Sequence, residues 1–567
     1  PGIFWDYEFK LRHAGTYWYH SHAGLQEQRG VYGAIVVEPA EPVAGVPPVD
    51  RDHVVVLSDW TDEHPDEVMR TLRRGDEWYA IRKGNQQSIW GAYRAGMLGE
   101  YLWNQWDNMP PMDISDVAYD RFWANGLDRV QLTGAAGEKV KLRLINAGAS
   151  TYFYVHSATG PLTVVSADGM PVRPFNRRRL LMGMGETYDV IVTVPAHGRY
   201  EVRATAQDGS GHASIFLGAG EQHFAKDIPK PKLYGMDWML AGLDDEELSS
   251  PESARPLAPY ARLRARESTA LPAEAPVREI ELRLTGDMQR YVWSFNDKTL
   301  KEESTIRVKR GEVVRMRFIN DTMMHHPLHL HGHFFRLLNG QGDFAPLKHT
   351  VDVPPMGKAA IEFLANEQGD WMFHCHLLYH MKAGMTRVIS YAEQGPDHRP
   401  KLNLKHMDPW QFTVDSTVQS NFTEGSAGWF NNRNRVGVDW EHGFADDEYE
   451  LDLVWKRYLN RDWSTLAGYR FTNHHGAADR AFAGVQHRLP FLTYGTATID
   501  SEGDLRLGIT RELQLTSRLS WVNELEHDTL SDWEWNTGLR YRLSKRWSVT
   551  GGYHTDYGLG AGLNFIW

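Results

Sequence analysis

The sequence predicts an all-β protein in which tandem Greek-key β-sandwiches are followed by an antiparallel β-barrel of the transmembrane type. Up to about residue 395, short runs rich in Val, Ile and aromatic residues alternate with Gly, Pro and Asp turns, as in "KVKLRLIN" and "TYDVIVTV". This composition and spacing are typical of β-sandwiches. After about residue 405 the runs lengthen to about ten residues and alternate with a period of two, which is typical of a membrane barrel.

The barrel segments carry one apolar and one polar face. In "WEWNTGLRYRL", for example, Trp533, Trp535 and Leu539 alternate with Glu534, Asn536 and Arg540. Roughly ten such segments follow one another, and the last one, "GLGAGLNFIW", ends on an aromatic residue. Aromatic residues favour the membrane interface, so we expect a barrel inserted in an outer membrane. A soluble antiparallel barrel stays open as an alternative, because the signal of a single barrel strand is weak.

Changes in composition divide the chain into regions. "AEPVAGVPPV" has the composition of a linker, and a Glu-, Ser-, Pro- and Ala-rich stretch has little strand signal. The predicted regions are the C-terminal part of a first sandwich at 1–45, a second sandwich at 46–230, a connection at 231–276, a third sandwich at 277–395, a linker at 396–407 and the barrel at 408–567. The chain begins without Met or a signal-peptide pattern, so we expect a fragment that lacks its natural N-terminus and export signal.

Composition excludes several function classes. The net charge is −12 and no long basic run occurs, so nucleic acid is not an expected partner. No apolar run is long enough for a membrane-spanning helix. The chain has one cysteine, Cys375, which leaves no internal disulfide and makes metal ligation or nucleophilic catalysis the candidate roles of the thiol.

The surroundings of this cysteine point to copper. "WMFHCHLLYHMKAGM" places Cys375, His380 and Met385 at intervals of five residues, and "HHPLHLHGH" (325–333) offers a second histidine. Two His, one Cys and a distant Met form the blue-copper ligand set. "HPLHLH" alone would also suit zinc, but the combination with the cysteine favours copper.

More histidines suggest a second metal site behind the first. Side chains alternate along a strand, so His374 and His376 should point away from Cys375 and its copper. The same alternation pairs His329 with His331 and His20 with His22. Together with His374 and His376, these residues give six imidazoles for a multinuclear site. We expect structural roles for His325, His333, His349, Met323 and Met324, and find no partner spacing for His474 and His475.

The chain resembles the multicopper oxidases, in particular the periplasmic copper-resistance oxidases of Gram-negative bacteria. The resemblance rests on "GTYWYHSHAGLQEQRGVYGAIVVEP", "HPLHLHGHFF" and "HCHLLYHMKAGM", among others. It implies cupredoxin-like sandwiches that hold a type 1 copper, a type 2 copper and a binuclear type 3 centre, four coppers in the complete protein. The implied ligands are His326, Cys375, His380 and Met385 for type 1, His329 for type 2, and His20, His22, His331, His374 and His376 for type 3. Two further histidines of the family belong to an H-x-H-G motif that would precede this sequence.

The barrel resembles a different group, the B-type copper-resistance proteins of the outer membrane, through "HMDPWQFTVDS" and the strands after it. Both resemblances together imply a periplasmic oxidase joined to an outer-membrane barrel. The implied activity is one-electron oxidation of Cu(I) or phenolic substrates coupled to four-electron reduction of O₂ to water, with Cys375, His374 and His376 conducting the electrons.

Three other functions stay open at this point. A copper-sequestering protein of the outer membrane would use the same ligands without turnover. A copper nitrite reductase would share the type 1 site but has no need of histidines on both sides of Cys375, and a zinc hydrolase has no need of Met385. Spacing alone singles out no Asp or Glu as the residue that delivers protons.

Overall fold

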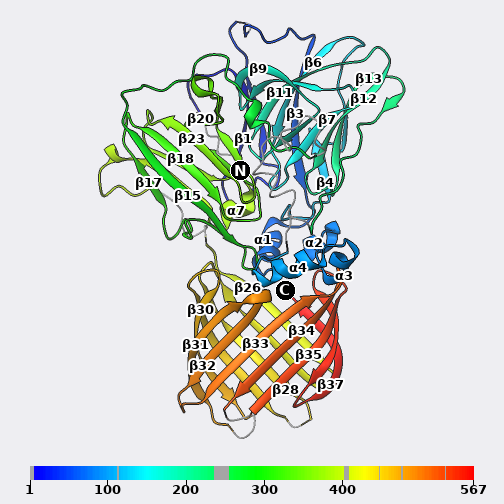
Figure 1. The fold of residues 1–567 in the computed structure, drawn as a ribbon, viewed down its shortest axis with the longest axis vertical. Coiled ribbons are helices and arrows are strands. Elements are labelled where there is room, and N and C mark those ends of the chain that lie inside the picture. Colours follow the sequence, from blue (N-terminus) through cyan, green and yellow to red (C-terminus); the bar gives the residue numbers. More distant parts are fainter. Residues whose placement is uncertain are drawn as a thin grey trace.

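The computed structural model describes residues 6–41, 43–111, 114–234, 255–400, 408–445, 447–473, 477–529 and 532–567. β-Sandwiches stand above a β-barrel, and a group of helices lies between them (Figure 1). The predicted region bounds stay a prediction, because both proposed connections, 231–276 and 396–407, lie partly outside the described residues.

The first region contributes a two-stranded antiparallel sheet. It consists of β1 (Gly15–His20) and β2 (Tyr32–Val37), with Gly15 opposite Val37 and His20 opposite Tyr32. Strand β1 ends at the first histidine of "HSH", so the sheet delivers this motif to the neighbouring sandwiches.

The second region contains two sheets packed on a common core. One sheet runs β10 (Arg179–Met182), β7 (Phe153–Ser157), β12 (Gly198–Ala206), β13 (His212–Ala219) and β5 (Arg129–Gln131), with β14 (Gln222–His223) beside β12. The other runs β4 (Arg121–Ala124), β3 (Arg51–Trp60), β6 (Lys139–Asn146), β11 (Thr187–Thr193), β8 (Leu162–Ala167) and β9 (Met170–Arg177). Val140, Leu142 and Leu144 alternate along β6 with no exposed surface, as expected for a strand that faces a core.

The third region repeats this architecture. Its first sheet runs β16 (Val292–Phe295), β15 (Val277–Asp287), β18 (Val313–Asn320), β23 (Lys358–Leu364), β20 (Phe335–Leu337) and β21 (Leu347–Lys348). Its second runs β17 (Thr305–Val308), β25 (Thr386–Tyr391), β24 (Asp370–Cys375), β19 (His326–Leu330) and β22 (Thr350–Val353), and the short helix α7 (Leu378–Lys382) follows β24. The 3₁₀ turns η2 (Gly342–Phe344) and η3 (Ala392–Gln394) complete it, and η1 (Tyr260–Arg262) lies in the chain before it. The second and third regions share one continuous hydrophobic core.

Four helices in the second region were not anticipated by the β-pattern. They are α1 (Pro65–Arg73), α2 (Trp78–Lys83), α3 (Ile89–Arg94) and α4 (Leu98–Trp106). Local signals for α1 exist: Pro65 occupies its first turn, and the His64 side chain accepts a hydrogen bond from the Asp66 amide. No helix in the described part of the chain is long and apolar enough to cross a membrane.

The C-terminal region is a closed antiparallel barrel, which confirms the predicted fold class. Its twelve strands are β26 (Gln411–Gln419), β27 (Phe422–Phe430), β28 (Asn434–Gly443), β29 (Tyr449–Tyr458), β30 (Trp463–Thr472), β31 (Arg480–Leu489), β32 (Thr493–Asp500), β33 (Leu505–Gln514), β34 (Leu519–Asp528), β35 (Asp532–Arg542), β36 (Trp547–His554) and β37 (Gly558–Ile566). The turn η6 (Pro490–Leu492) joins β31 to β32. About ten strands were expected; strands such as "FTEGSAGWF" carry too many small residues to show clear alternation.

The barrel wall turns apolar side chains outward and charges inward. Trp535 on β35 and Trp455 on β29 are 47% and 49% exposed. Inside, Arg506 pairs with Glu450 at 2.7 Å and with Asp528 at 2.9 Å. A large exposed apolar surface around a polar interior is the arrangement of barrels that sit in lipid, and it disfavours the soluble alternative.

The sandwiches and the barrel meet through polar contacts at one barrel mouth. Arg73 of α1 donates to Asn432 in the turn after β27, and Asp76 pairs with Arg542 at 2.7 Å. Arg488 of the barrel lies 3.4 Å from Asp287 of β15. A chamber of about 1000 Å³ fills the lumen below this contact and is lined by residues of both parts.

Candidate metal centres

The only cysteine lies beside two histidines in the interior of the third region. Cys375 ends β24, His326 begins the adjacent strand β19, and His380 lies on α7. The Cys375 Sγ atom is 3.6 Å from Nδ1 of His326 and 3.8 Å from Nδ1 of His380, and the two Nδ1 atoms are 3.2 Å apart. The Cys375 amide donates to the Met385 carbonyl at 3.1 Å, and this hydrogen bond places Met385 next to the cysteine. We call these four fully buried residues the type 1 set.

The far side of each imidazole in the type 1 set has its own partner. Nε2 of His326 lies 2.8 Å from the Thr322 hydroxyl, and Nε2 of His380 lies 3.1 Å from Oδ2 of Asp116. With the proton on Nε2, both Nδ1 lone pairs face the sulfur, which is the tautomer a metal on Nδ1 needs. A soft thiolate with two imidazole nitrogens and a nearby Met fits copper.

Asp116 is a residue that sequence reasoning did not single out. Its Oδ2 atom also accepts a hydrogen bond from the Tyr291 hydroxyl at 2.7 Å. Burial alone would raise the pKa of Asp116, but His380 and Tyr291 outweigh it and hold this pKa below its ordinary value. The carboxylate therefore stays ionised and fixes His380. Its only sequence signal is its place in "DISDVAYD", inside one of the segments that carry the family resemblance.

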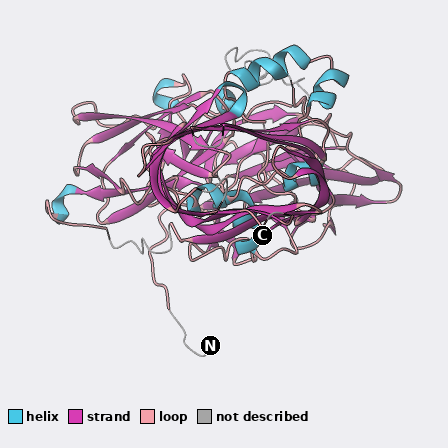
Figure 2. Cartoon of the chain, turned by 90° about the horizontal axis from the view of Figure 1, so that it is seen from below, coloured by secondary structure: helices cyan, strands magenta, loops and turns pink. Residues whose placement is uncertain are grey.

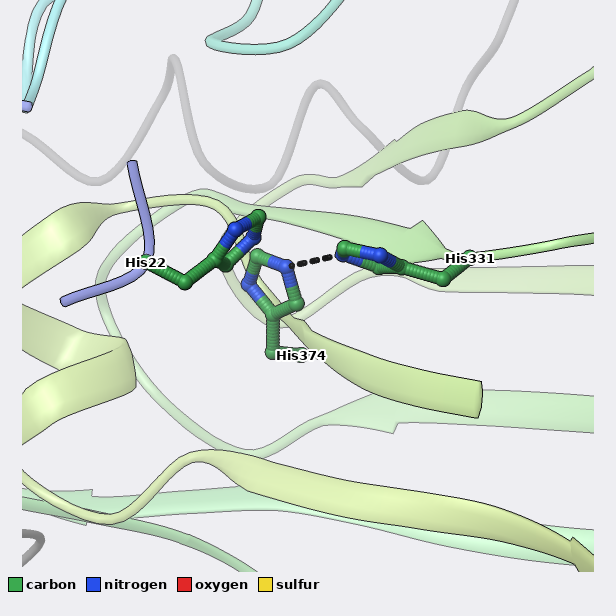
Figure 3. A group of neighbouring side chains, drawn as sticks. All are labelled: His22, His331 and His374. Carbon is green, nitrogen blue, oxygen red and sulfur yellow. Dashed lines mark hydrogen bonds between the residues drawn. The ribbon is translucent and has the colours of Figure 1, made fainter. Parts of the chain in front are cut away.

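The six remaining predicted ligands gather in a second site, here called the histidine cluster. It consists of His20, His22, His329, His331, His374 and His376. Figure 3 shows His22 of the first region facing His331 and His374 of the third. The Nε2 atoms of His331 and His374 are 3.2 Å apart. His20 lies 4.9 Å from His376 and His329 lies 5.5 Å from it, measured between ring centroids.

The tautomers of the histidine cluster leave nitrogen atoms free to bind metal. Nδ1 of His374 donates to the Cys375 carbonyl at 2.8 Å, and Nδ1 of His329 donates to the His349 carbonyl at 2.8 Å. Nδ1 of His20 lies 2.7 Å from Glu27. In each ring the lone pair then lies on Nε2, which is the atom that can ligate a metal. Nε2 of His22 and Nδ1 of His376 are buried and make no hydrogen bond, an arrangement that a bound cation would satisfy.

Burial also keeps five imidazoles of the histidine cluster neutral. It lowers the pKa of His22 to about 3 and of His331 to about 4, with neighbouring histidines adding to the effect. The pKa values of His329, His374 and His376 are lowered for the same reason. Neutral imidazole is the form that ligates metal, so the histidine cluster is ready to bind copper at neutral pH.

Glu27 is the second residue that spacing could not identify. Its side chain is 2% exposed and faces Nδ1 of His20. Burial raises the pKa of Glu27 although His20 opposes the shift. It follows "HSH" by five residues in a loop, and no periodicity in the sequence marks a contact of this kind.

The two sites lie back to back, as alternation along the strand predicts. Cys375 is opposite Leu328 and His374 is opposite His329 in the pairing of β24 with β19. The thiol therefore faces the type 1 set, while His374 and His376 face the histidine cluster. Gly185 of the second region packs closely against the histidine cluster. It has φ +82°, and a Cβ there would come within 2.6 Å of the His376 ring.

The other histidines of these motifs are held by protein groups. His325 lies 2.8 Å from Asp352, and His333 lies 2.7 Å from the Tyr391 hydroxyl. His349 is 3.0 Å from the Thr350 hydroxyl. These contacts agree with the structural roles expected for them. His474 and His475 lie outside the described residues.

Sequence comparisons identify the family of the sandwiches. Residues 1–42, 51–219 and 274–395 each match a family described as multicopper oxidase. Copper resistance protein A of Escherichia coli is 33% identical over 488 residues, which cover 69% of this chain and 80% of that protein. A copper resistance protein A homolog of Pseudomonas syringae pv. tomato is 32% identical over 69% of this chain and 79% of its own length. Multicopper oxidase MmcO of Mycobacterium tuberculosis is 30% identical over 69% and 72%.

These matches agree with the geometry of the two sites, in which one thiol and eight histidines gather at adjoining positions. The matched residues include every predicted ligand. The chain is therefore a member of the multicopper oxidase family, an oxidoreductase related to copper resistance protein A, and it continues into a closed twelve-strand β-barrel.

Proposed function

We propose that this protein oxidises Cu(I) or a phenolic substrate one electron at a time and reduces O₂ to water, at the outer membrane of a Gram-negative bacterium. The observation that carries the proposal is the back-to-back placement of the type 1 set and the histidine cluster. Bound copper would supply the one-electron redox chemistry. In this assignment the type 1 set holds one copper, His329 contributes to a type 2 copper, and the other cluster histidines hold a type 3 pair.

The chain itself connects the two sites. Cys375 is bonded through the backbone to His374 and His376, and His374 Nδ1 donates to the Cys375 carbonyl at 2.8 Å. A covalent path and a hydrogen-bonded path thus run from the thiol to the histidine cluster. No other side chain in the type 1 set has a cluster histidine as its sequence neighbour, which explains why the single cysteine stands between two histidines.

Residues around the sites exclude water and hold protons. The type 1 set has no exposed surface, and Trp293 stacks on His380 at 3.8 Å between ring centroids. Glu27, against His20, is a buried carboxyl group with a raised pKa. This placement supports a role for Glu27 in holding a proton at the edge of the histidine cluster.

The barrel supports the proposed location. Its outward face is apolar and aromatic, and the sandwiches stand on one mouth. In this arrangement the oxidase lies on the periplasmic side and copper is oxidised near the cell surface. The related copper resistance proteins support a role in copper detoxification.

Metal analysis with visible and EPR spectra, together with oxygen consumption, tests the proposal. We expect blue copper in the type 1 set, further copper in the histidine cluster, and oxygen consumption that depends on both sites. The His333→Gln variant, which removes a histidine held by Tyr391, is the matched control and should keep both signals. If the protein binds only the blue copper and consumes no oxygen, copper sequestration without turnover replaces the oxidase function.

A further inference from the structure

An exposed aromatic surface lies on two helices of the second region. It consists of Trp90 and Tyr93 on α3 and Leu102, Trp103 and Trp106 on α4, and we call it the helical patch. Trp103 is 64% exposed and Tyr93 is 63% exposed. Trp90 and Tyr93 stack on each other at 5.6 Å, so their rings form one surface. Neither metal site uses any of these side chains.

Helix α4 has two distinct faces. Tyr101 and Gln105, one turn apart, are buried, and the Gln105 side chain accepts a hydrogen bond from Arg511 of β33 at 3.1 Å. Leu102, Trp103 and Trp106 lie on the remaining surface and stay exposed. The Gln105 contact therefore fixes the helix to the barrel, while most of its apolar side stays exposed.

The contacts of helices α3 and α4 place them at the rim of the barrel, between the chamber and the outer wall. Leu505, Leu507 and Ile509 of β33 point outward, whereas Arg511, nearer the sandwiches, lines the chamber together with Tyr101 and Gln105 of α4. The Trp90 amide donates to the Leu515 carbonyl at 3.0 Å in the turn after β33. Seen from the barrel end, a run of helices lies beside the ring of strands rather than within it (Figure 2).

The helical patch continues the lipid-facing wall of the barrel. The ring of Trp106 meets Phe491, in the turn between β31 and β32, edge-on at 5.3 Å. At the same end of the barrel, Trp463, Trp521 and Trp547 are 44%, 41% and 45% exposed on the outer wall. Tryptophan and tyrosine at this level form the belt that meets lipid headgroups in membrane barrels.

We propose that the helical patch rests in the headgroup region of the membrane leaflet next to the sandwiches and attaches the oxidase to the bilayer at a second point. The inference rests on the proposed membrane location of the barrel. Trp and Tyr suit this position because their rings are apolar and their N–H or O–H groups stay in contact with water. Contact with the lipid would cover an apolar surface that the described part of the chain leaves exposed, and would hold the sandwiches upright over the barrel mouth.

The single buried cysteine makes a site-specific test possible. Trp103→Cys places a labelling site on the helical patch, Leu539→Cys places one on the outer barrel wall, and Leu127→Cys places one on an exposed apolar residue of the second region. Each full-length, copper-loaded variant is labelled with an environment-sensitive fluorophore. It is then reconstituted in phosphatidylethanolamine and phosphatidylglycerol vesicles that carry nitroxide lipids at shallow or deep positions. The unsubstituted chain gives the background from Cys375, and the blue absorbance reports folding.

Shallow nitroxides should quench the label at position 103 at least about twofold, deep nitroxides should quench the label at 539, and neither should quench the label at 127. Quenching at 539 without quenching at 103 would overturn the inference and leave the membrane barrel intact. Absence of quenching at 539 would refute the membrane location itself, and the inference with it. A label at 103 that is shielded from aqueous iodide but insensitive to nitroxide lipids would show that a protein partner or a second copy covers the helical patch instead.

Discussion

The type 1 set and the histidine cluster differ in how the chain builds them. All four residues of the type 1 set come from the third region and are completely buried. The histidine cluster joins the first region to the third, and four of its members, His20, His22, His329 and His331, are only partly buried. A site within one sandwich forms when that sandwich folds, whereas a site across a seam also needs the two regions to dock. The type 1 set should therefore survive changes that empty the histidine cluster.

The largest expected effect comes from removing Cys375, the residue of the type 1 set that is bonded to two histidines of the histidine cluster. Cys375→Ser should abolish the blue absorbance and reduce oxygen consumption to background, because the hydroxyl is a hard, weakly donating ligand and cannot replace the thiolate. Visible spectroscopy and oxygen electrode measurements check this outcome, with His333→Gln as the control. A blue band that persists in Cys375→Ser would refute the assignment of the type 1 set.

The next prediction separates the two sites. His22→Gln removes one of three histidines whose ligand atoms lie within 4.8 Å of one another, across the seam between the regions. We expect loss of copper from the histidine cluster and of oxygen consumption, while the blue absorbance keeps its intensity. Metal analysis and EPR spectra measure both centres in one sample. Equal loss of the blue copper would show that the two sites do not form independently.

Local pattern predicted much of this arrangement. The alternation of Cys375 with His374 and His376 was sufficient to assign them to opposite faces, because side-chain direction along a strand depends only on sequence position. The same rule predicted that Trp533 and Trp535 share the outer wall of the barrel. A pattern with a period of two can be read from a few neighbouring residues, because it does not depend on contacts with distant segments.

Contacts between distant segments could not be predicted in this way. Asp116 meets His380 from 264 positions earlier in the chain, and nothing in its spacing indicates this. Helices α1 to α4 interrupt a β-rich region, and their position over the barrel depends on pairs such as Asp76 and Arg542. Such contacts arise from docking of folded units, which single-sequence periodicity does not encode.

Substitution of two carboxyl groups, one beside each site, allows a matched comparison of the sites, with expected effects of intermediate size. Asp116→Asn keeps a group that can accept the Tyr291 hydrogen bond but removes the charge that fixes His380. Glu27→Gln makes the equivalent change beside His20. Loss of such a supporting contact weakens metal affinity or activity by about 10–100-fold. We expect Asp116→Asn to weaken blue copper binding and Glu27→Gln to weaken the histidine cluster, as measured by copper titration with EPR detection. The prediction is wrong if either variant affects both centres equally.

The smallest expected effect is the pH dependence of stability in the copper-free protein. The pKa of His22 is about 3 and that of His331 about 4 in the folded state, both below the ordinary value of 6.5. Below pH 6.5 the unfolded chain therefore binds protons that the folded chain excludes, and folding stability falls as the pH drops toward 4. Above pH 6.5 these histidines contribute no pH dependence. The loss should be on the order of a few kcal/mol.

Urea unfolding of the copper-free protein between pH 4.5 and 7.5 measures this slope. The His22→Gln variant should show a flatter dependence, because glutamine takes up no proton in either state. His64→Gln is the control, since His64 is exposed at the start of α1 and lies outside both sites. If His22→Gln left the pH dependence of stability unchanged, the partly buried boundary between the two regions would not exclude protons from the folded protein. The histidine cluster would then differ from the type 1 set in that it assembles from two regions. It would not differ in the free energy needed to keep its imidazoles neutral.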